Sequence, residues 1–178
     1  IVLPPPVGTM IRPLSEFVTD ASISERWQRL TEQIRSPARL LAVSKGHAAT
    51  AVREIASLGQ LDFGESRLQE ALPKQAALAD LALRWHFIGR LQSNKVRGVL
   101  RAFPVIHSVD SWSLAERMSR IAAEENLCPE LFLQVKLRPD PSKGGWSEQG
   151  LIECWPQLKR LPSVKIVGLM TMAPRAEG

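Results

Sequence analysis

The chain has no tyrosine, only two cysteines and no long apolar run among its 178 residues. Cys128 and Cys154 are too few for a disulfide framework and lack metal-ligand spacing, which is typical of a protein from a reducing compartment. Because no stretch of about eighteen apolar residues occurs, we expect no transmembrane helix. The proline-broken segment 1–6 lacks a basic region, so we do not interpret it as a secretory signal.

Charged residues are present in ordinary number but without a pattern. Lys and Arg total 23 against 18 Asp and Glu, which gives a net charge of +5 and a pI of about 9.7. The basic residues are scattered and aromatic residues make up only 6% of the chain, so no basic stripe predicts a nucleic-acid surface. We interpret the excess as a solvated surface, and expect neither nucleic acid nor membrane among the partners.

The apolar residues alternate between two periods, as expected for one globular domain of the α/β class. Helical spacing predicts six helices, at 15–36, 48–58, 67–81, 93–100, 113–122 and 151–158. Short apolar runs predict six strands, at 40–43, 61–64, 85–89, 105–109, 131–137 and 164–172. Strands that alternate with helices in this way indicate a parallel sheet.

Two of these helices carry specific side-chain patterns. Ser113 and Glu116 have the spacing of a capping box, which predicts that a helix begins near Ser113. The helix at 67–81 is predicted to turn four apolar side chains inward: Leu68, Ala71, Leu72 and Ala76.

The periodicity fits both an open, doubly wound sheet and a closed barrel. After the first strand the chain reads Ser44-Lys45-Gly46-His47, so the glycine-rich fingerprint of a dinucleotide-binding fold is absent there. A P-loop is also absent, and no sequence repeat exists beyond the alternation itself. The residues alone therefore leave the two architectures open.

Lys45 is the first candidate for chemistry, because it follows the first strand directly. In a parallel barrel, functional side chains project from the carboxyl ends of the strands. A lysine beside apolar surroundings loses its proton more readily, and Schiff-base formation with an aldehyde needs the neutral amine. The alternative interpretation is a surface lysine in a loop, and position alone does not decide between them.

Other candidates carry weaker signals. Gln134 and Lys136 share one face of the fifth strand, which suggests a lumen or site, because a strand buried on both faces should be apolar throughout. His86, in the third strand, fits a hydrogen-bonded core residue better than a catalytic base. Arg90 and Lys95 flank a helix start that favours anions, although an ordinary capped junction explains them equally.

Two further groups have no specific spacing. His107 and Asp110, in and after the fourth strand, are candidates for a base and the residue that orients it. The loop Ser142-Lys143-Gly144-Gly145 permits close approach of the backbone to a ligand, but a plain turn accounts for it as well. No convergent spacing of His, Asp or Glu predicts a metal site.

Four motifs together point to a known family. They read Ala42-Val43-Ser44-Lys45, Phe63-Gly64-Glu65, Gly168-Leu169-Met170 and, most specifically, Trp85-His86-Phe87-Ile88-Gly89 followed by Leu91-Gln92 and Asn94-Lys95. From about residue 40 to residue 174 the chain resembles the YggS/PROSC family of pyridoxal 5′-phosphate (PLP) homeostasis proteins. These are single-domain barrels similar to the N-terminal domain of alanine racemase.

The resemblance implies a (β/α)8 TIM-type barrel of PLP fold type III, over residues 15–178 after a leader at 1–14. It implies PLP held as a Schiff base on Lys45, a cytoplasmic location and no established catalysis. We expect a monomer that buffers PLP or delivers it to apo PLP-enzymes. Cofactor contacts are expected at Lys45, Ser66, His86, Lys136 and Met170.

The sequence departs from the family at three places. Ser66 stands where the family usually has Asn, and Lys143-Gly144-Gly145 replaces a Lys-Ser-Gly loop, which puts two side-chain contacts in doubt. Family members continue past Met172 with two more βα units that hold the phosphate, whereas this sequence stops at Gly178. We therefore expect the last two βα units to be absent from this sequence, which leaves an open sheet edge.

Three other functions compete with a PLP carrier. A PLP-dependent racemase or decarboxylase needs an acid or base on the cofactor's other face, and the tyrosine that usually partners the lysine in racemases is absent. An aldolase-like barrel that uses the lysine directly on substrate lacks a supporting motif. A basic interaction module rests on the pI alone.

Overall fold

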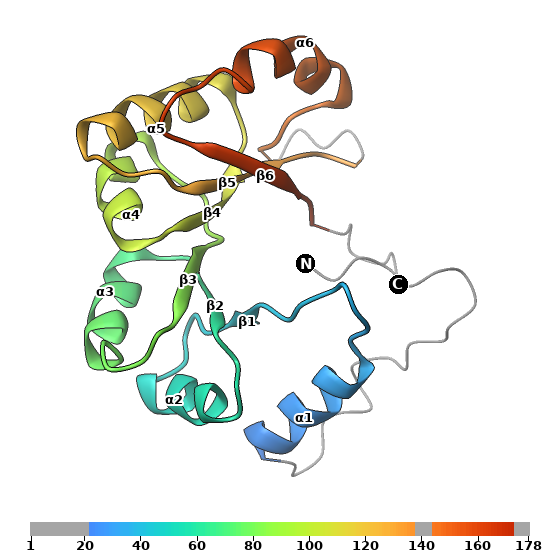
Figure 1. Ribbon diagram of the computed structural model, residues 1–178, viewed down its shortest axis with the longest axis vertical. Coiled ribbons are helices and arrows are strands. Elements are labelled where there is room, and N and C mark those ends of the chain that lie inside the picture. Colours follow the sequence, from blue (N-terminus) through green and yellow to red (C-terminus); the bar gives the residue numbers. More distant parts are fainter. Residues whose placement is uncertain (1–21, 138–143, 173–178) are drawn as a thin grey trace.

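The computed structural model describes residues 22–137 and 144–172 (Figure 1), and the predicted leader at 1–14 lies outside them. Within these residues six strands alternate with six α-helices, as predicted. The strands are β1 (Ala42–Val43), β2 (Asp62–Glu65), β3 (Arg84–Phe87), β4 (Val105–Val109), β5 (Glu130–Gln134) and β6 (Lys165–Met170). The helices are α1 (Ile23–Gln33), α2 (Ala49–Ser57), α3 (Leu68–Ala77), α4 (Val96–Ala102), α5 (Trp112–Glu124) and α6 (Glu148–Leu158), with a 3-10 turn η2 (Ser93–Lys95) before α4.

The order of the strands decides between the two architectures. All neighbours are parallel, and the order β1-β2-β3-β4-β5-β6 follows the chain. Figure 1 shows the strands curving around a common centre, with α2 to α6 on the outside. A doubly wound sheet reverses its strand order and carries helices on both faces. The fold is therefore of the barrel type, and six consecutive strands of it are described.

The core lies between the sheet and its outer helices. Ile106, Leu131 and Leu133 of the strands and Val99 and Met118 of the helices are fully buried there. Alternate strand residues point to this layer and to the inner face of the sheet, as the pleat requires. The inner-face residues are therefore the ones available to a site.

Three sequence predictions about these elements were wrong in detail. Helix α5 has Ser111 as its N-cap, without a side-chain hydrogen bond, and the capping box lies instead at α1, between Ser22 and Glu25. Leu72 and Ala76 of α3 are exposed, because the buried stripe runs through Ala71 and Lys74. Strand β5 ends at Gln134, and Leu137 is exposed.

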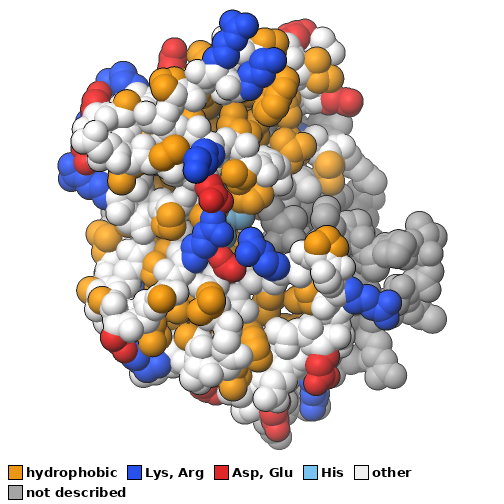
Figure 2. Space-filling view, viewed as in Figure 1, with side chains coloured by type: hydrophobic (Ala, Val, Ile, Leu, Met, Phe, Trp, Pro, Cys, Tyr) orange, Lys and Arg blue, Asp and Glu red, His pale blue; other side chains and the backbone are white. Residues whose placement is uncertain are grey.

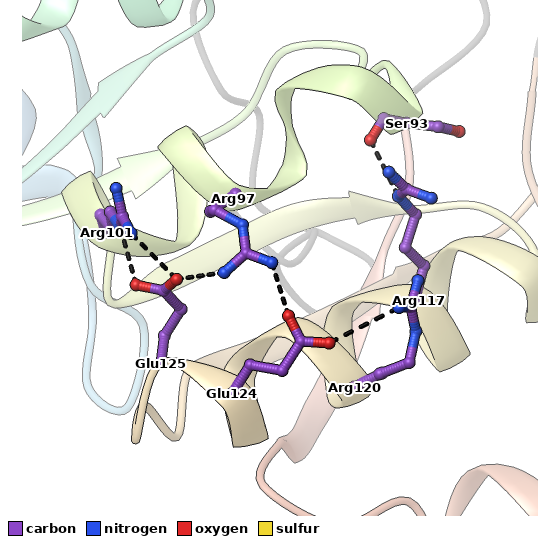
Figure 3. Close-up of polar contacts among 7 residues, drawn as sticks. All are labelled: Ser93, Arg97, Arg101, Arg117, Arg120, Glu124 and Glu125. Atoms are coloured by element: carbon purple, nitrogen blue, oxygen red, sulfur yellow. Dashed lines mark hydrogen bonds and ion pairs between the residues drawn. The ribbon is translucent and has the colours of Figure 1, made fainter.

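The outer surface of α4 and α5 carries a network of ion pairs (Figure 3). Arg97 binds Glu124 at 2.5 Å and also Glu125, while Arg101 binds Glu125 at 2.7 Å. The Glu125 carboxylate raises the pKa of the Arg101 guanidinium, and Arg101 and Arg97 in turn lower the pKa of Glu125. Such solvated pairs contribute little to stability. They show that part of the basic excess is neutralised locally.

Charged residues also line the amino ends of the strands. Arg84 and Glu130, the first residues of β3 and β5, form an ion pair at 2.6 Å. Figure 2 shows acidic and basic side chains side by side near the middle of the face that it presents.

An apolar groove lies at the β6 edge of the sheet. Val167 and Leu169 of β6 are exposed and line this groove beside Trp155 of α6. In the described residues β6 pairs only with β5.

Candidate functional site at the carboxyl rim of the sheet

Four of the five predicted contact residues lie at one rim. Lys45 follows β1, Ser66 follows β2, Lys136 lies two residues after β5, and Met170 ends β6. The carboxyl ends of parallel strands meet at the same edge, so the fold brings these residues to one side of the sheet. Met170 is buried and Ser66 and Lys136 are half-buried, whereas Lys45 is exposed. The apolar enclosure expected around Lys45 is therefore not seen, although its place at the strand exit is as predicted.

A buried polar cluster holds the turn that carries Lys45. The Ser44 hydroxyl donates to Glu65 Oε1 at 2.7 Å, and Lys74 Nζ donates to the same oxygen at 2.5 Å and to the Ser44 carbonyl oxygen at 2.7 Å. The side chain of Glu65 is 0% exposed and that of Lys74 is 6% exposed. Glu65 Oε2 is buried without a hydrogen-bond partner in the described residues. The cluster thus pairs two charges in the interior, in contact with Ser44, the residue before Lys45.

A second contact reaches the other side of Lys45. The Gly46 N–H donates to Glu70, and Glu70 lies 3.7 Å from Lys74, four residues further along α3. The Gly46 N–H, followed by the Lys74 ammonium, holds the pKa of the Glu70 carboxyl below its usual range. Gly46 has φ +75° with open space around its α-carbon, so the backbone conformation favours glycine there.

Sequence reasoning missed Glu70 and Lys74. One signal was present, because Lys74 lies three residues after Ala71 and therefore shares the helix stripe that faces the sheet. A lysine on a buried stripe is almost never unpaired, so its position predicts an acidic partner. The i, i+4 spacing of Glu70 and Lys74 was the second signal.

A hydrogen-bonded chain of three side chains lies on the inner face of the sheet. His86 Nε2 lies 2.9 Å from Asp62 Oδ1, and His86 Nδ1 lies 2.9 Å from His107 Nε2. The His107 ring stacks on Phe132 with ring centroids 4.4 Å apart. The interpretation of His86 as a hydrogen-bonded core residue is therefore confirmed. The pairing of His107 with Asp110 was wrong, because His107 turns its Nε2 towards β3.

Burial keeps both histidines neutral. It lowers the pKa of His107 to about 4, with His86 contributing, and it lowers the pKa of His86 despite the Asp62 hydrogen bond. His86 Nε2–H then donates to Asp62 and its Nδ1 accepts from His107 Nε2–H. This leaves His107 Nδ1 as an unprotonated acceptor, which agrees with its having no partner in the described residues. Both ring nitrogens of His86 are engaged, and its contact with a cofactor stays a prediction.

The neutral state of His107 predicts a loss of stability in mild acid. Its pKa is near 4 when folded and near 6.5 when unfolded, so the unfolded chain gains the proton first as the pH falls below 6.5. We expect the free energy of unfolding to decrease by about 2 kcal/mol between pH 7 and pH 5 through this group alone. Urea unfolding at the two pH values measures the decrease. In His107→Gln, which keeps an N–H donor for His86, the decrease should be smaller by that amount; an equal decrease would contradict the assignment.

The described residues offer few other kinds of site. No group of three or more His, Cys, Asp or Glu side chains among them could hold a metal ion. None of their helices has both the length and the apolar character needed to cross a membrane. The fold and the rim together define a class of protein: a parallel βα barrel with an exposed amine at the exit of its first strand.

Comparison with known proteins gives the family. The family described as alanine racemase, N-terminal domain, matches residues 18–178. A pyridoxal phosphate homeostasis protein of Pseudomonas aeruginosa is 41% identical over 169 residues, which is 88% of this chain and 73% of that protein. The chain belongs to this family, in the YggS/PROSC group of pyridoxal phosphate homeostasis proteins.

A second relative shows how much of a family member's length the chain covers. The pyridoxal phosphate homeostasis protein of Synechocystis is 50% identical over 137 residues, which is 76% of this chain and 63% of that protein. The chain thus spans less than two thirds of the length of this relative.

Solved structures agree with the fold. The structure of PipY from Synechococcus elongatus with PLP bound is 51% identical, with a TM-score of 0.82 over 87% of this chain and 72% of that one. Alanine racemase of Clostridium difficile is 16% identical, with a TM-score of 0.68 over 85% of this chain and 43% of that one, so it supports the fold alone. These matches confirm the predicted barrel.

The residues at the rim fit an aldehyde cofactor. Such a cofactor needs a primary amine that it can reach, and the Lys45 side chain is exposed on a turn that is fixed from both sides. The Ser66 hydroxyl lies beyond the neighbouring strand, and Met170 offers an apolar side chain at the same rim.

Proposed function

We propose that this chain binds PLP through Lys45 and serves in the intracellular homeostasis of the cofactor. The observation that carries the proposal is the position of Lys45, an exposed amine on a fixed turn at the carboxyl rim of a PLP-type barrel. The 51%-identical PipY, whose structure contains PLP, supports it. The names of the curated relatives support the homeostasis role.

The chemistry requires little of the protein. The Lys45 amine adds to the aldehyde carbon, a C=N bond replaces the C=O bond, and the oxygen leaves as water. An exposed position lets a free amine displace the lysine again, which suits a carrier better than an enclosed catalyst. Ser66, Lys136 and Met170 are proposed to contact the cofactor, and His86 to lie beneath it. Release to apo PLP-enzymes, a monomeric state and a cytoplasmic location complete the proposal.

A non-catalytic role is favoured over a racemase. PLP supplies an electron sink, but an enzyme also needs a positioned acid or base on the second face of the cofactor. The chain has no tyrosine to act there. Incubation of the PLP-loaded protein with single L-amino acids, followed by chiral analysis, tests this: the appearance of D-amino acid would overturn the non-catalytic role.

Lys45→Met should abolish covalent binding at this position. We expect wild-type protein mixed with PLP and then reduced with borohydride to carry one pyridoxyl group on the Lys45 peptide. The variant should bind at least about tenfold more weakly, because only non-covalent contacts remain. Lys159→Met, at the exposed end of α6, is the matched control and should bind as the wild type does. A wild-type Lys45 peptide without label would refute the proposal.

A further inference from the structure

Both residues that flank Lys45 are held by side chains from outside the turn. On one side, Lys74 Nζ donates to the Ser44 carbonyl oxygen at 2.7 Å, and the Ser44 hydroxyl donates to Glu65 at 2.7 Å. On the other side, the Gly46 N–H donates to Glu70. Three charged side chains from β2 and α3 therefore fix the backbone immediately before and after Lys45.

Glu70 and Lys74 pair with each other along α3, but both also reach out of the helix to the turn, and Lys74 reaches Glu65 of β2 as well. Lys74 is buried, and burial of an ion pair is costly, because the loss of water around both charges offsets their attraction. Apolar side chains of similar size in place of both Glu65 and Lys74 would pack between the sheet and α3 at no such cost. Glu65 in addition leaves Oε2 unpartnered and buried in the described residues. Stability alone therefore does not explain the cluster.

We propose that Glu65, Glu70 and Lys74 are positioning residues for Lys45. They hold the Ser44–Gly46 backbone so that the Lys45 amine stands at the rim in one orientation, ready for an aldehyde. The inference rests on the proposed function, since it assigns these residues a role in the bond that Lys45 forms. The positioning would make the reaction with PLP selective, because the fixed turn favours Lys45 over the other exposed lysines.

The test measures where PLP reacts. One equivalent of PLP is added to the full chain, the product is reduced with borohydride, and peptide mapping gives the share of label on Lys45 against all other lysines. In the double variant Glu65→Gln with Lys74→Met, which leaves no buried charge unpaired, we expect this share to fall about tenfold. The single variant Lys74→Arg keeps N–H donors and the positive charge, so its share of label on Lys45 should lie between that of the double variant and that of the wild type.

Two variants complete the design. Arg53→Met breaks an exposed ion pair between α2 and Asp80 near the end of α3, without touching the turn, and should leave the share unchanged. Glu70→Ala removes a half-exposed side chain, so it should fold, and we expect about a threefold fall because one of two anchors remains. This variant decides the question if the double variant does not fold.

The outcomes separate the two hypotheses. If the wild type leaves Lys45 unlabelled, the proposed function fails and the positioning role fails with it. If the wild type is labelled on Lys45 but the folded double variant or Glu70→Ala keeps the wild-type share, the positioning role alone is overturned. A loss of stability without a change in share is what a purely structural role would give.

Discussion

Lys74→Met is expected to destabilise the fold by about 3–5 kcal/mol, which is the cost of leaving one member of a buried ion pair without its partner. The Glu65 carboxylate would then remain buried beside Ser44 with a single hydrogen bond at Oε1 and none at Oε2. Its side chain is 0% exposed, so water cannot replace the ammonium without a rearrangement of the turn. Urea unfolding at pH 7 measures the loss.

A double-mutant cycle gives the decisive comparison. Glu65→Gln combined with Lys74→Met removes both charges, and we expect it to recover more than half of the stability lost in Lys74→Met. Arg53→Met, which breaks an exposed pair with Asp80, should cost less than about 1 kcal/mol. If the losses of the two single variants simply add in the double variant, the buried pair is not coupled as the contacts indicate.

Gly89→Ala should be at least as damaging, for a steric reason. A β-carbon at this position would lie 2.1 Å from the Ser66 carbonyl oxygen, which is far inside van der Waals contact with a backbone atom. Backbone cannot move aside as a side chain does, so β2 and β3 must separate where they leave the sheet. We expect a loss of more than about 4 kcal/mol or the absence of soluble folded protein.

Gly150→Ala is the control for this prediction. Its nearest neighbour is Ser147 Oγ at 3.0 Å, which caps α6 by accepting the Gly150 N–H. A shift of a few tenths of an ångström in this side chain makes room for a methyl group, and alanine favours the helix over glycine, so we expect a change within about 1 kcal/mol. Soluble yield, circular dichroism and thermal unfolding compare the two variants. A Gly89→Ala protein with wild-type stability would contradict the close approach of Gly89 to the Ser66 carbonyl oxygen.

The strands could be predicted from the sequence because each buried strand is a short apolar run between helical segments. The choice between barrel and doubly wound sheet could not, because it depends on which side of the sheet each crossover helix packs. That side is set by tertiary contacts, and the periodicity of a helix at 48–58 is the same in both folds. The resemblance to a family supplied the barrel, and the strand order confirmed it.

The site was predicted only in part. The position of Lys45 follows from the end of a strand, which the sequence reveals. The side chains that hold its turn come from α3, where Leu72 and Ala76 appeared to form the inward face, so Lys74 was overlooked. The hydrogen bonds that link Asp62, His86 and His107 likewise join three strands. Spacing along the sequence does not predict contacts between side chains of different strands.

The strand order has a consequence for how the chain folds. Within residues 22–137 and 144–172, each of the strands β1 to β5 pairs with the strand that follows it, so each of these pairings closes a loop of only one helix and its connections. The entropy lost on closing a loop rises with its length, and a sheet built from such local pairings has a low contact order for its class. The sheet can therefore assemble sequentially, with each βα unit pairing to the strand edge that the preceding unit has formed.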